Sequence, residues 1–233
     1  PIGKSSQICY LRFTAENPRG FSRNETIAKT VGIHLKQNIM KLGKLFWTSG
    51  SILINITIGI YIYLSSKAPL NPMERHNYVN ENWDIYGMHW KIEFLFMTFI
   101  AIGALYFAFN LKKISWTIIS VGQLILLSTY PIMLGGYENT SFELSQMANQ
   151  MATIVFVFGN LIFLGGLLKL YSSDINLKKW LKWTAIALSG ITFLTFLITF
   201  IGIIDWRQAM IIGPLINVLY LINAYYGMKL KLE

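Results

Sequence analysis

The sequence predicts an all-α membrane protein, a six-transmembrane-helix bundle with both termini in the cytoplasm. Composition is the first observation, since 54% of the residues are hydrophobic and only 13% are charged, against about 25% charged in soluble domains. The second is the length of the apolar stretches, and the third is the alternation of basic residues between them. The lipid bilayer is therefore the expected partner, and the bacterial inner membrane the expected location.

Six stretches are long enough to cross a bilayer. A spanning helix needs about 20 mainly apolar residues, because backbone polar groups in lipid must pair within the segment. The six predicted spans are residues 45–65, 90–110, 116–137, 148–170, 180–204 and 209–228.

The connections between these spans alternate in basic content. Lysine and arginine in short loops mark the cytoplasmic side of a membrane protein. Residues 137–146 contain no Lys or Arg, the turn 205–207 contains one, and the long loop 66–89 contains more acidic than basic residues. These three connections are expected outside. Lysines mark the other connections and the two flanks of the spans: Lys41, Lys44, Lys112, Lys113, Lys178, Lys179, Lys182, Lys229 and Lys231.

The amino-terminal stretch differs from the rest of the chain. Residues 1–39 are rich in Lys and Arg, show no sustained period, and lack the compact apolar core of a secretory signal. Met40 directly precedes the first basic flank and the first apolar run. We therefore divide the chain into a basic tail, residues 1–39, and a transmembrane domain, residues 40–233, and hypothesise that Met40 is the natural start. Mass spectrometry of the natural amino terminus tests this hypothesis.

The first outer loop contains its own helical signal. Prolines at its start, such as Pro69, break helix. After them Tyr78, Trp83, Tyr86 and Trp90 recur at roughly helical spacing among polar residues. This pattern predicts a short amphipathic helix in the outer interface before the second span, either as an aromatic anchor or as a lid over a ligand.

Polar residues inside the spans show which helix faces avoid lipid. Spans one, five and six each carry small and polar residues on one face, with Thr192, Thr195 and Thr199 in span five as an example. Such faces indicate either helix packing through hydrogen bonds or a polar cavity, and the pattern does not separate the two. The candidate intramembrane residues are Asn55, Gln123, Asn160, Asn217 and Asn223.

Glu93 is the most informative of these residues. It lies about one turn inside the second span, where an ionisable group is a functional hypothesis by default. His89 precedes it by four residues and shares its helical face. Asp205 and Arg207 begin the sixth span at the same outer level, so Glu93 is expected either to pair with Arg207 or to form a titratable outer pocket with His89, Arg207 and His76.

Two prolines, Pro131 and Pro214, fall within the third and sixth predicted spans. Proline removes a backbone donor and obstructs the preceding turn, so both spans are expected to kink or to lose a hydrogen bond.

Enzyme and cofactor signatures are not found in the sequence. It contains no zinc-protease motif, nucleophile elbow, phosphate-binding loop or dinucleotide fingerprint. His89 and Glu93 would supply only two metal ligands, and the single cysteine, Cys9, has no partner for a disulfide. The net charge of +9 comes from residues between apolar runs, which argues against nucleic acid. We therefore expect no catalytic residues, metal, cofactor or nucleic-acid partner.

The order of elements resembles that of six-helix bacterial integral membrane proteins grouped as a domain of unknown function. The shared features are the outer loop with an aromatic helix, the turn at Lys112 and Lys113, and the closing segment Ile212-Gly-Pro-Leu-Ile-Asn-Val-Leu-Tyr220. This resemblance implies a helical bundle and no particular catalytic residues.

The leading functional hypothesis is a membrane protein that binds, senses or transports a small or lipidic molecule through an outer-side pocket near Glu93. Two alternatives remain open from the sequence. One is a membrane-embedded enzyme on a lipid-like substrate, with Glu93 or His89 as acid or base; the other is a non-catalytic scaffold subunit of a membrane complex. The sequence does not indicate the oligomeric state.

Overall fold

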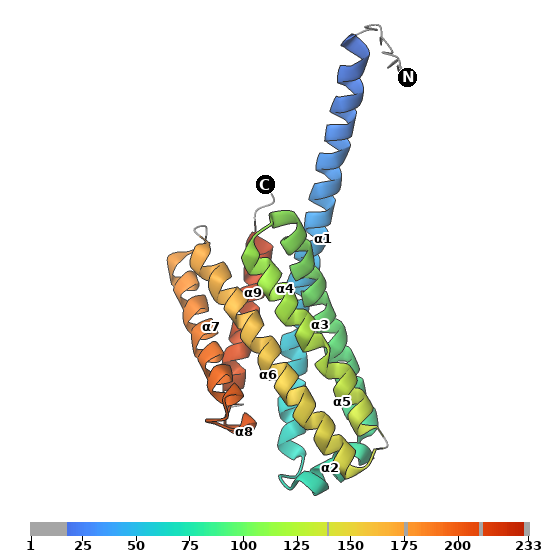
Figure 1. Cartoon of the computed structure of the whole chain (residues 1–233), viewed down its shortest axis with the longest axis vertical. Coiled ribbons are helices and arrows are strands. Elements are labelled where there is room, and N and C mark those ends of the chain that lie inside the picture. The colour runs from blue at the N-terminus through green and yellow to red at the C-terminus, as the bar shows by residue number, and fades with distance from the viewer. Residues whose placement is uncertain (1–17, 139, 175–176, 210–211, 231–233) are drawn as a thin grey trace, which may run out of the picture. The chain divides into compact units, whose positions relative to one another are not determined.

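The computed structural model describes residues 18–138, 140–174, 177–209 and 212–230, and side chains from residue 40 onward except those of residues 206 and 207. The chain divides into two compact units, Pro1–Gln37 and Asn38–Glu233. Within the described ranges the regular structure is helical, without a β-strand (Figure 1). The helices are α1 (Pro18–Lys67), α2 (Pro72–Glu81), α3 (Trp83–Leu111), α4 (Ile114–Leu127), α5 (Thr129–Tyr137), α6 (Phe142–Ser173), α7 (Lys179–Phe200), α8 (Trp206–Ala209) and α9 (Gly213–Lys229).

Five helices are long and apolar enough to cross a membrane, which indicates a multi-pass membrane protein. They correspond to the first five predicted spans. Their bounds are Met40–Lys67, Trp83–Leu111, Ile114–Tyr137, Phe142–Ser173 and Lys179–Phe200.

The predicted fifth and sixth spans differ from the helices found. The fifth ends at Phe200, before the predicted limit of residue 204, because the chain turns at Gly202 with a φ of 78° that favours glycine. The predicted sixth span, residues 209–228, is covered by α9, which has 17 residues. Residues 210 and 211 at its start lie outside the described residues, so a sixth membrane span stays a prediction.

The two prolines in predicted spans behave differently. The third span is interrupted at Ser128, between α4 and α5, three residues before Pro131. This break agrees with the prediction, because Pro131 has no N–H to donate to the preceding turn. Pro214 lies in the first turn of α9, where proline is tolerated. The prediction of a kink inside the sixth span is therefore wrong for the helix described.

The outer loop between α1 and α3 contains a helix, but one shorter than the aromatic pattern predicts. The Asn71 side chain caps α2 by accepting hydrogen bonds from the backbone N–H groups of Met73 and Glu74. Of the four aromatic residues in the pattern, only Tyr78 lies in α2; the others belong to α3. The helical spacing of these aromatic residues continues from α2 into α3, because the single break at Asn82 does not disturb it.

Glycines bring two pairs of helices into close contact in the second unit. A Cβ added at Gly103 of α3 would lie 2.5 Å from the backbone nitrogen of Trp47 in α1. A Cβ added at Gly122 of α4 would lie 2.4 Å from the backbone nitrogen of Phe163 in α6. Both contacts bury large side chains, and Trp47 is fully buried. Backbone approach of this kind is typical of helix packing in lipid.

Apolar side chains also cover much of the outward surface of the second unit. Exposed examples occur on α1, α3, α4, α6 and α7: Ile56, Leu95, Leu124, Ile154 and Leu194. Their regular presence on successive helices is expected of surfaces that face lipid.

The connections between the helices lie at two opposite ends of the second unit (Figure 1). The α3–α4 and α6–α7 connections and the end of α9 lie at one end of it, whereas α2 and the α5–α6 connection lie at the other (Figure 1). At the first end, the Lys44 ammonium donates a hydrogen bond to the Leu230 carbonyl at 2.9 Å, which joins α1 to the segment after α9.

Candidate functional site

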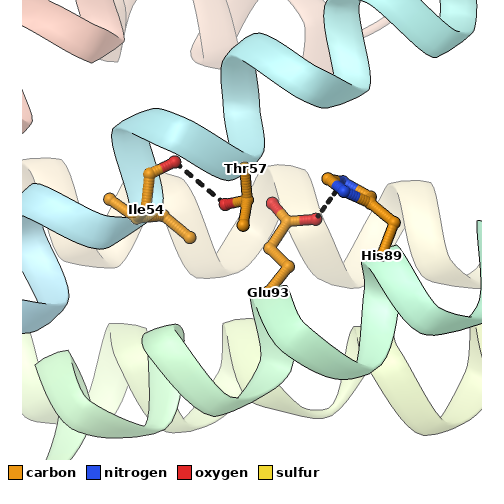
Figure 2. A network of polar contacts seen from close by, with 4 residues as sticks. All are labelled: Ile54, Thr57, His89 and Glu93. Atoms are coloured by element: carbon orange, nitrogen blue, oxygen red, sulfur yellow. Dashed lines mark hydrogen bonds and ion pairs between the residues drawn. The ribbon is translucent and has the colours of Figure 1, made fainter.

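A cavity of about 210 Å³ lies inside the second unit and is lined by residues of α1, α3, α4, α5, α6 and α9. Glu93 lines it from α3, one turn after His89. The spacing of four residues places both side chains on the same face of α3, and both extend from that helix toward α1 (Figure 2). The structure therefore places Glu93 and His89 side by side on α3, and Glu93 is the one of the two that lines the cavity.

Glu93 and His89 form an ion pair if the imidazole is protonated. The distance from His89 Nε2 to Glu93 Oε2 is 3.5 Å, which is longer than the roughly 2.7–2.9 Å of a charge-assisted hydrogen bond. The Glu93 side chain is 18% exposed, against 5% for His89. On its other side, the His89 ring stacks on Tyr61 of α1 at a centroid distance of 6.0 Å and an interplanar angle of 17°. His89 is thus held between two helices, and Glu93 remains accessible from the cavity.

Aromatic and aliphatic side chains form most of the cavity wall. Tyr61, Trp90, Tyr130 and Tyr220 line it from four different helices. The hydroxyls of Tyr130 and Tyr220 are close enough to the Glu93 carboxylate to interact with it electrostatically. The site therefore combines one carboxylate and several phenolic hydroxyls with a mostly apolar wall, in which Thr129, Asn149, Thr153 and Asn160 are the other polar side chains.

A second cavity of about 310 Å³ adjoins the first. Tyr61, Trp90, Met133 and Asn149 line both cavities, so the two share a boundary. The second cavity extends toward α2 and includes Arg75. Small-molecule sites commonly enclose about 300–1,000 Å³, a range that the two cavities reach together.

His76 lines the second cavity, separate from Glu93. The distance from its Nδ1 to the Ser145 hydroxyl oxygen is 2.8 Å, and the Asn80 amide nitrogen lies 3.0 Å from its Nε2. The Ser145 hydroxyl donates to the Phe142 carbonyl at 2.9 Å. All three contacts are satisfied when the His76 Nδ1–H donates to Ser145 and Nε2 accepts from Asn80. In that arrangement His76 cannot act as a base toward Ser145, so this pair joins α2 to α6 without forming a nucleophile.

Asp205, which was predicted to lie at the same outer level as Glu93, makes a local contact near the start of α8. The Asp205 carboxylate accepts a hydrogen bond from the Gln208 backbone N–H at 2.8 Å, and Asp205 is exposed. The side chain of Arg207 lies outside the described residues. Its proposed pairing with Glu93 therefore stays a prediction.

The candidate amides inside the spans have different environments. Asn160 lines the Glu93 cavity, whereas the Asn55 amide donates to the Ser51 carbonyl of its own helix at 2.7 Å. Gln123 is fully buried near Tyr220, and neither of its amide atoms has a hydrogen-bond partner among the described residues. Within the same residues, Asn217 Oδ1 is buried without a partner.

The threonines of the fifth predicted span do not join helices through hydrogen bonds. Thr192, Thr195 and Thr199 each donate to the carbonyl four residues earlier in α7. The packing interpretation predicted hydrogen bonds between helices here, and for these hydroxyls it is wrong. Threonine hydroxyls satisfy themselves within a helix when no partner is in reach.

Hydrogen bonds between helices converge on Asn223. Its backbone carbonyl accepts from Trp47 Nε1 at 2.8 Å, and its side-chain oxygen accepts from the Tyr171 hydroxyl. Sequence reasoning selected Asn223 but neither partner, because Trp47 and Tyr171 look like interfacial aromatics near the ends of spans. Both side chains are fully buried, unlike aromatic residues at a membrane interface.

No family model matches the chain, and comparisons with curated proteins and with solved structures find no similar protein. The resemblance in layout therefore assigns no family. In the part of the chain that the structure describes, no group of three or more His, Cys, Asp or Glu residues is placed to hold a metal ion.

Proposed function

We propose that this protein binds a small or lipidic molecule in the Glu93 cavity, reached from the outer side of a bacterial inner membrane, in order to sense or transport it. The observation that carries the proposal is a cavity within the helices whose wall includes an ionisable side chain. A carboxylate kept at such a position is costly in lipid and is retained where it serves a ligand, ion or proton.

The proposal includes six spans with both termini in the cytoplasm. Two observations support this arrangement. Lysine-bearing connections and the end of α9 lie at one end of the second unit, as the positive-inside rule requires of a cytoplasmic face (Figure 1). The helix α9, at 17 residues, is also at the lower limit of spanning length.

The two alternative functions lack such support. The enzyme alternative assigns Glu93 or His89 as the acid or base, which would also need a nucleophile or a bound water within reach. The His76–Ser145 pair does not supply that nucleophile, because the hydrogen bonds of both groups are structural. A scaffold subunit needs no internal cavity.

Cysteine accessibility tests the proposal without knowledge of the ligand. In the full chain with Cys9→Ser, Thr153→Cys places a thiol on the cavity wall in α6, and Ile154→Cys places the matched control on the adjacent, 61% exposed, lipid-facing position. A small membrane-impermeant thiol reagent applied from outside is expected to label residue 153 many times faster than residue 154, because only the cavity admits water.

Equal and slow labelling of both positions would show that the outer side does not open to the cavity, and the proposed binding function would be abandoned. Labelling of residue 153 from the cytoplasmic side alone would overturn the outer-side access. Each variant is first checked for a monodisperse elution profile and an unchanged Tm.

A further inference from the structure

We infer that the ligand of the Glu93 cavity is an organic cation, a protonated amine on an apolar body. This inference rests on the proposed binding function and assigns its ligand class. It is drawn from the charge, hydrogen-bonding capacity and shape of the cavity.

Charge is the first step. Among the described residues that line the cavity, Glu93 is the only one with a carboxyl, amino, guanidinium or imidazole side chain. An anionic ligand would bring a second negative charge beside it in a poorly solvated site, which is strongly unfavourable. With a neutral ligand, the long 3.5 Å contact with His89 would be the carboxylate's one ionic contact among the described residues, whereas an ammonium group would add a second.

The basic residues nearby do not remove this preference. His89 contacts one carboxylate oxygen at 3.5 Å, and a carboxylate has about four acceptor positions on its two oxygens. A single imidazole N–H therefore leaves room for an ammonium group. Lys91 is exposed and does not line the cavity, and Arg75 lines only the adjoining one.

The walls suit the rest of such a ligand. Trp90 and three tyrosines, Tyr61, Tyr130 and Tyr220, line the cavity with Glu93. The faces of aromatic rings attract cations, most strongly where water is excluded. The remaining wall is mostly aliphatic, which stabilises an apolar body. The volume of about 210 Å³ matches a compact arylalkyl amine better than a complete phospholipid.

Binding of matched probes tests this inference. The full chain in phosphatidylcholine nanodiscs is titrated with 4-phenylbutylamine, 4-phenylbutanol and 4-phenylbutyrate, which share one apolar body and differ in charge. Binding to empty nanodiscs is subtracted. The ammonium probe is expected to bind at least tenfold more tightly than the alcohol, and the carboxylate probe more weakly than both.

Variants locate the site. Glu93→Gln is expected to weaken binding of the amine at least tenfold and to remove its advantage over the alcohol, since tenfold corresponds to about 1.4 kcal/mol. Glu143→Gln is the matched control, because Glu143 is an exposed carboxylate of α6 that lines neither cavity. Arg75→Gln is expected to leave amine binding unchanged or tighter.

The outcomes separate this inference from the proposed function. Equal or tighter binding of the alcohol or the carboxylate overturns the cation assignment, and so does amine binding that survives Glu93→Gln. If no probe binds while residue 153 is labelled from outside, the cation assignment fails and the open cavity stands. If residue 153 is also unlabelled, both fail. The comparison of probes on the unmodified chain does not depend on the folding of any variant.

Discussion

Asn223 is the residue at which three helices of the second unit are held together. Asn223 lies in α9. Its backbone carbonyl accepts a hydrogen bond from Trp47 of α1, and its side-chain oxygen accepts one from Tyr171 of α6. All three residues are fully buried. Interhelical hydrogen bonds in lipid average about 0.6 kcal/mol and reach about 1.7 kcal/mol, so a fully enclosed example should lie at the upper end.

Tyr171→Phe is expected to lower the free energy of unfolding by about 1–2 kcal/mol, because the ring is retained while Asn223 Oδ1 loses its donor. Reversible unfolding in mixed micelles measures the change. A double-mutant cycle with Asn223→Ala should give a coupling energy above 0.5 kcal/mol. Tyr63→Phe is the control, since that side chain is 57% exposed, and it should change stability by less than about 0.5 kcal/mol. A coupling energy near zero would refute the bond.

Glycines determine how closely α4 and α6 approach each other. α4 packs on α6 along Gly122, Gly159 and Gly166, where an added Cβ would meet the partner helix at less than 3.0 Å. Some glycines have no such role: Gly59 of α1 has nothing within 4 Å of the same position. Glycine content alone therefore does not show which helices touch.

Gly122→Ala is expected to destabilise the protein by about 1–3 kcal/mol and to lower its Tm, since the new methyl group would collide with the Phe163 backbone and force α4 and α6 apart. Gly59→Ala is the matched control in another span. It should leave the Tm unchanged or raise it, because alanine favours helix by up to about 1 kcal/mol over glycine. Equal loss of stability in the two variants would contradict the packing.

At the scale of the whole molecule, the distribution of charge is the basis of the proposed orientation. Lysines occur at the connections and flanks predicted to be cytoplasmic, while the α5–α6 connection has neither Lys nor Arg in residues 137–146. Moving lysines across a membrane during insertion is costly, so this pattern favours the proposed orientation.

Reporter fusions test the orientation. A fluorescent protein joined after Lys113 is expected to be bright, because the proposed topology places that turn in the cytoplasm. A phosphatase that is active only outside the cytoplasm should be active when joined after Gln146 and inactive after Lys113. The proposed topology would be contradicted if fusions after Lys113 and after Gln146 gave the same fluorescence and the same phosphatase activity.

The sequence by itself determined the apolar, all-helical class, five helices that are long and apolar enough to cross a membrane, and the position of Glu93 beside His89. These properties depend on local quantities, namely the length of an apolar run, the period of a helix and a spacing of four residues. The break near Pro131 follows from the same local chemistry. Two predictions failed only in where a helix ends: the end of the fifth span, and the extent of the aromatic helix in the outer loop. The periodicity of a sequence defines the ends of helices poorly.

Only the tertiary structure decided which side chains meet. Tyr171 and Asn223 are 52 residues apart, and the aromatic residues around Glu93 come from four helices. The rotation of each helix about its axis depends on the fit between facing side chains, and many rotations satisfy the same hydrophobic pattern. That fit assigned His76 to a structural bond and Glu93 to a cavity, a difference that no spacing along the chain expresses.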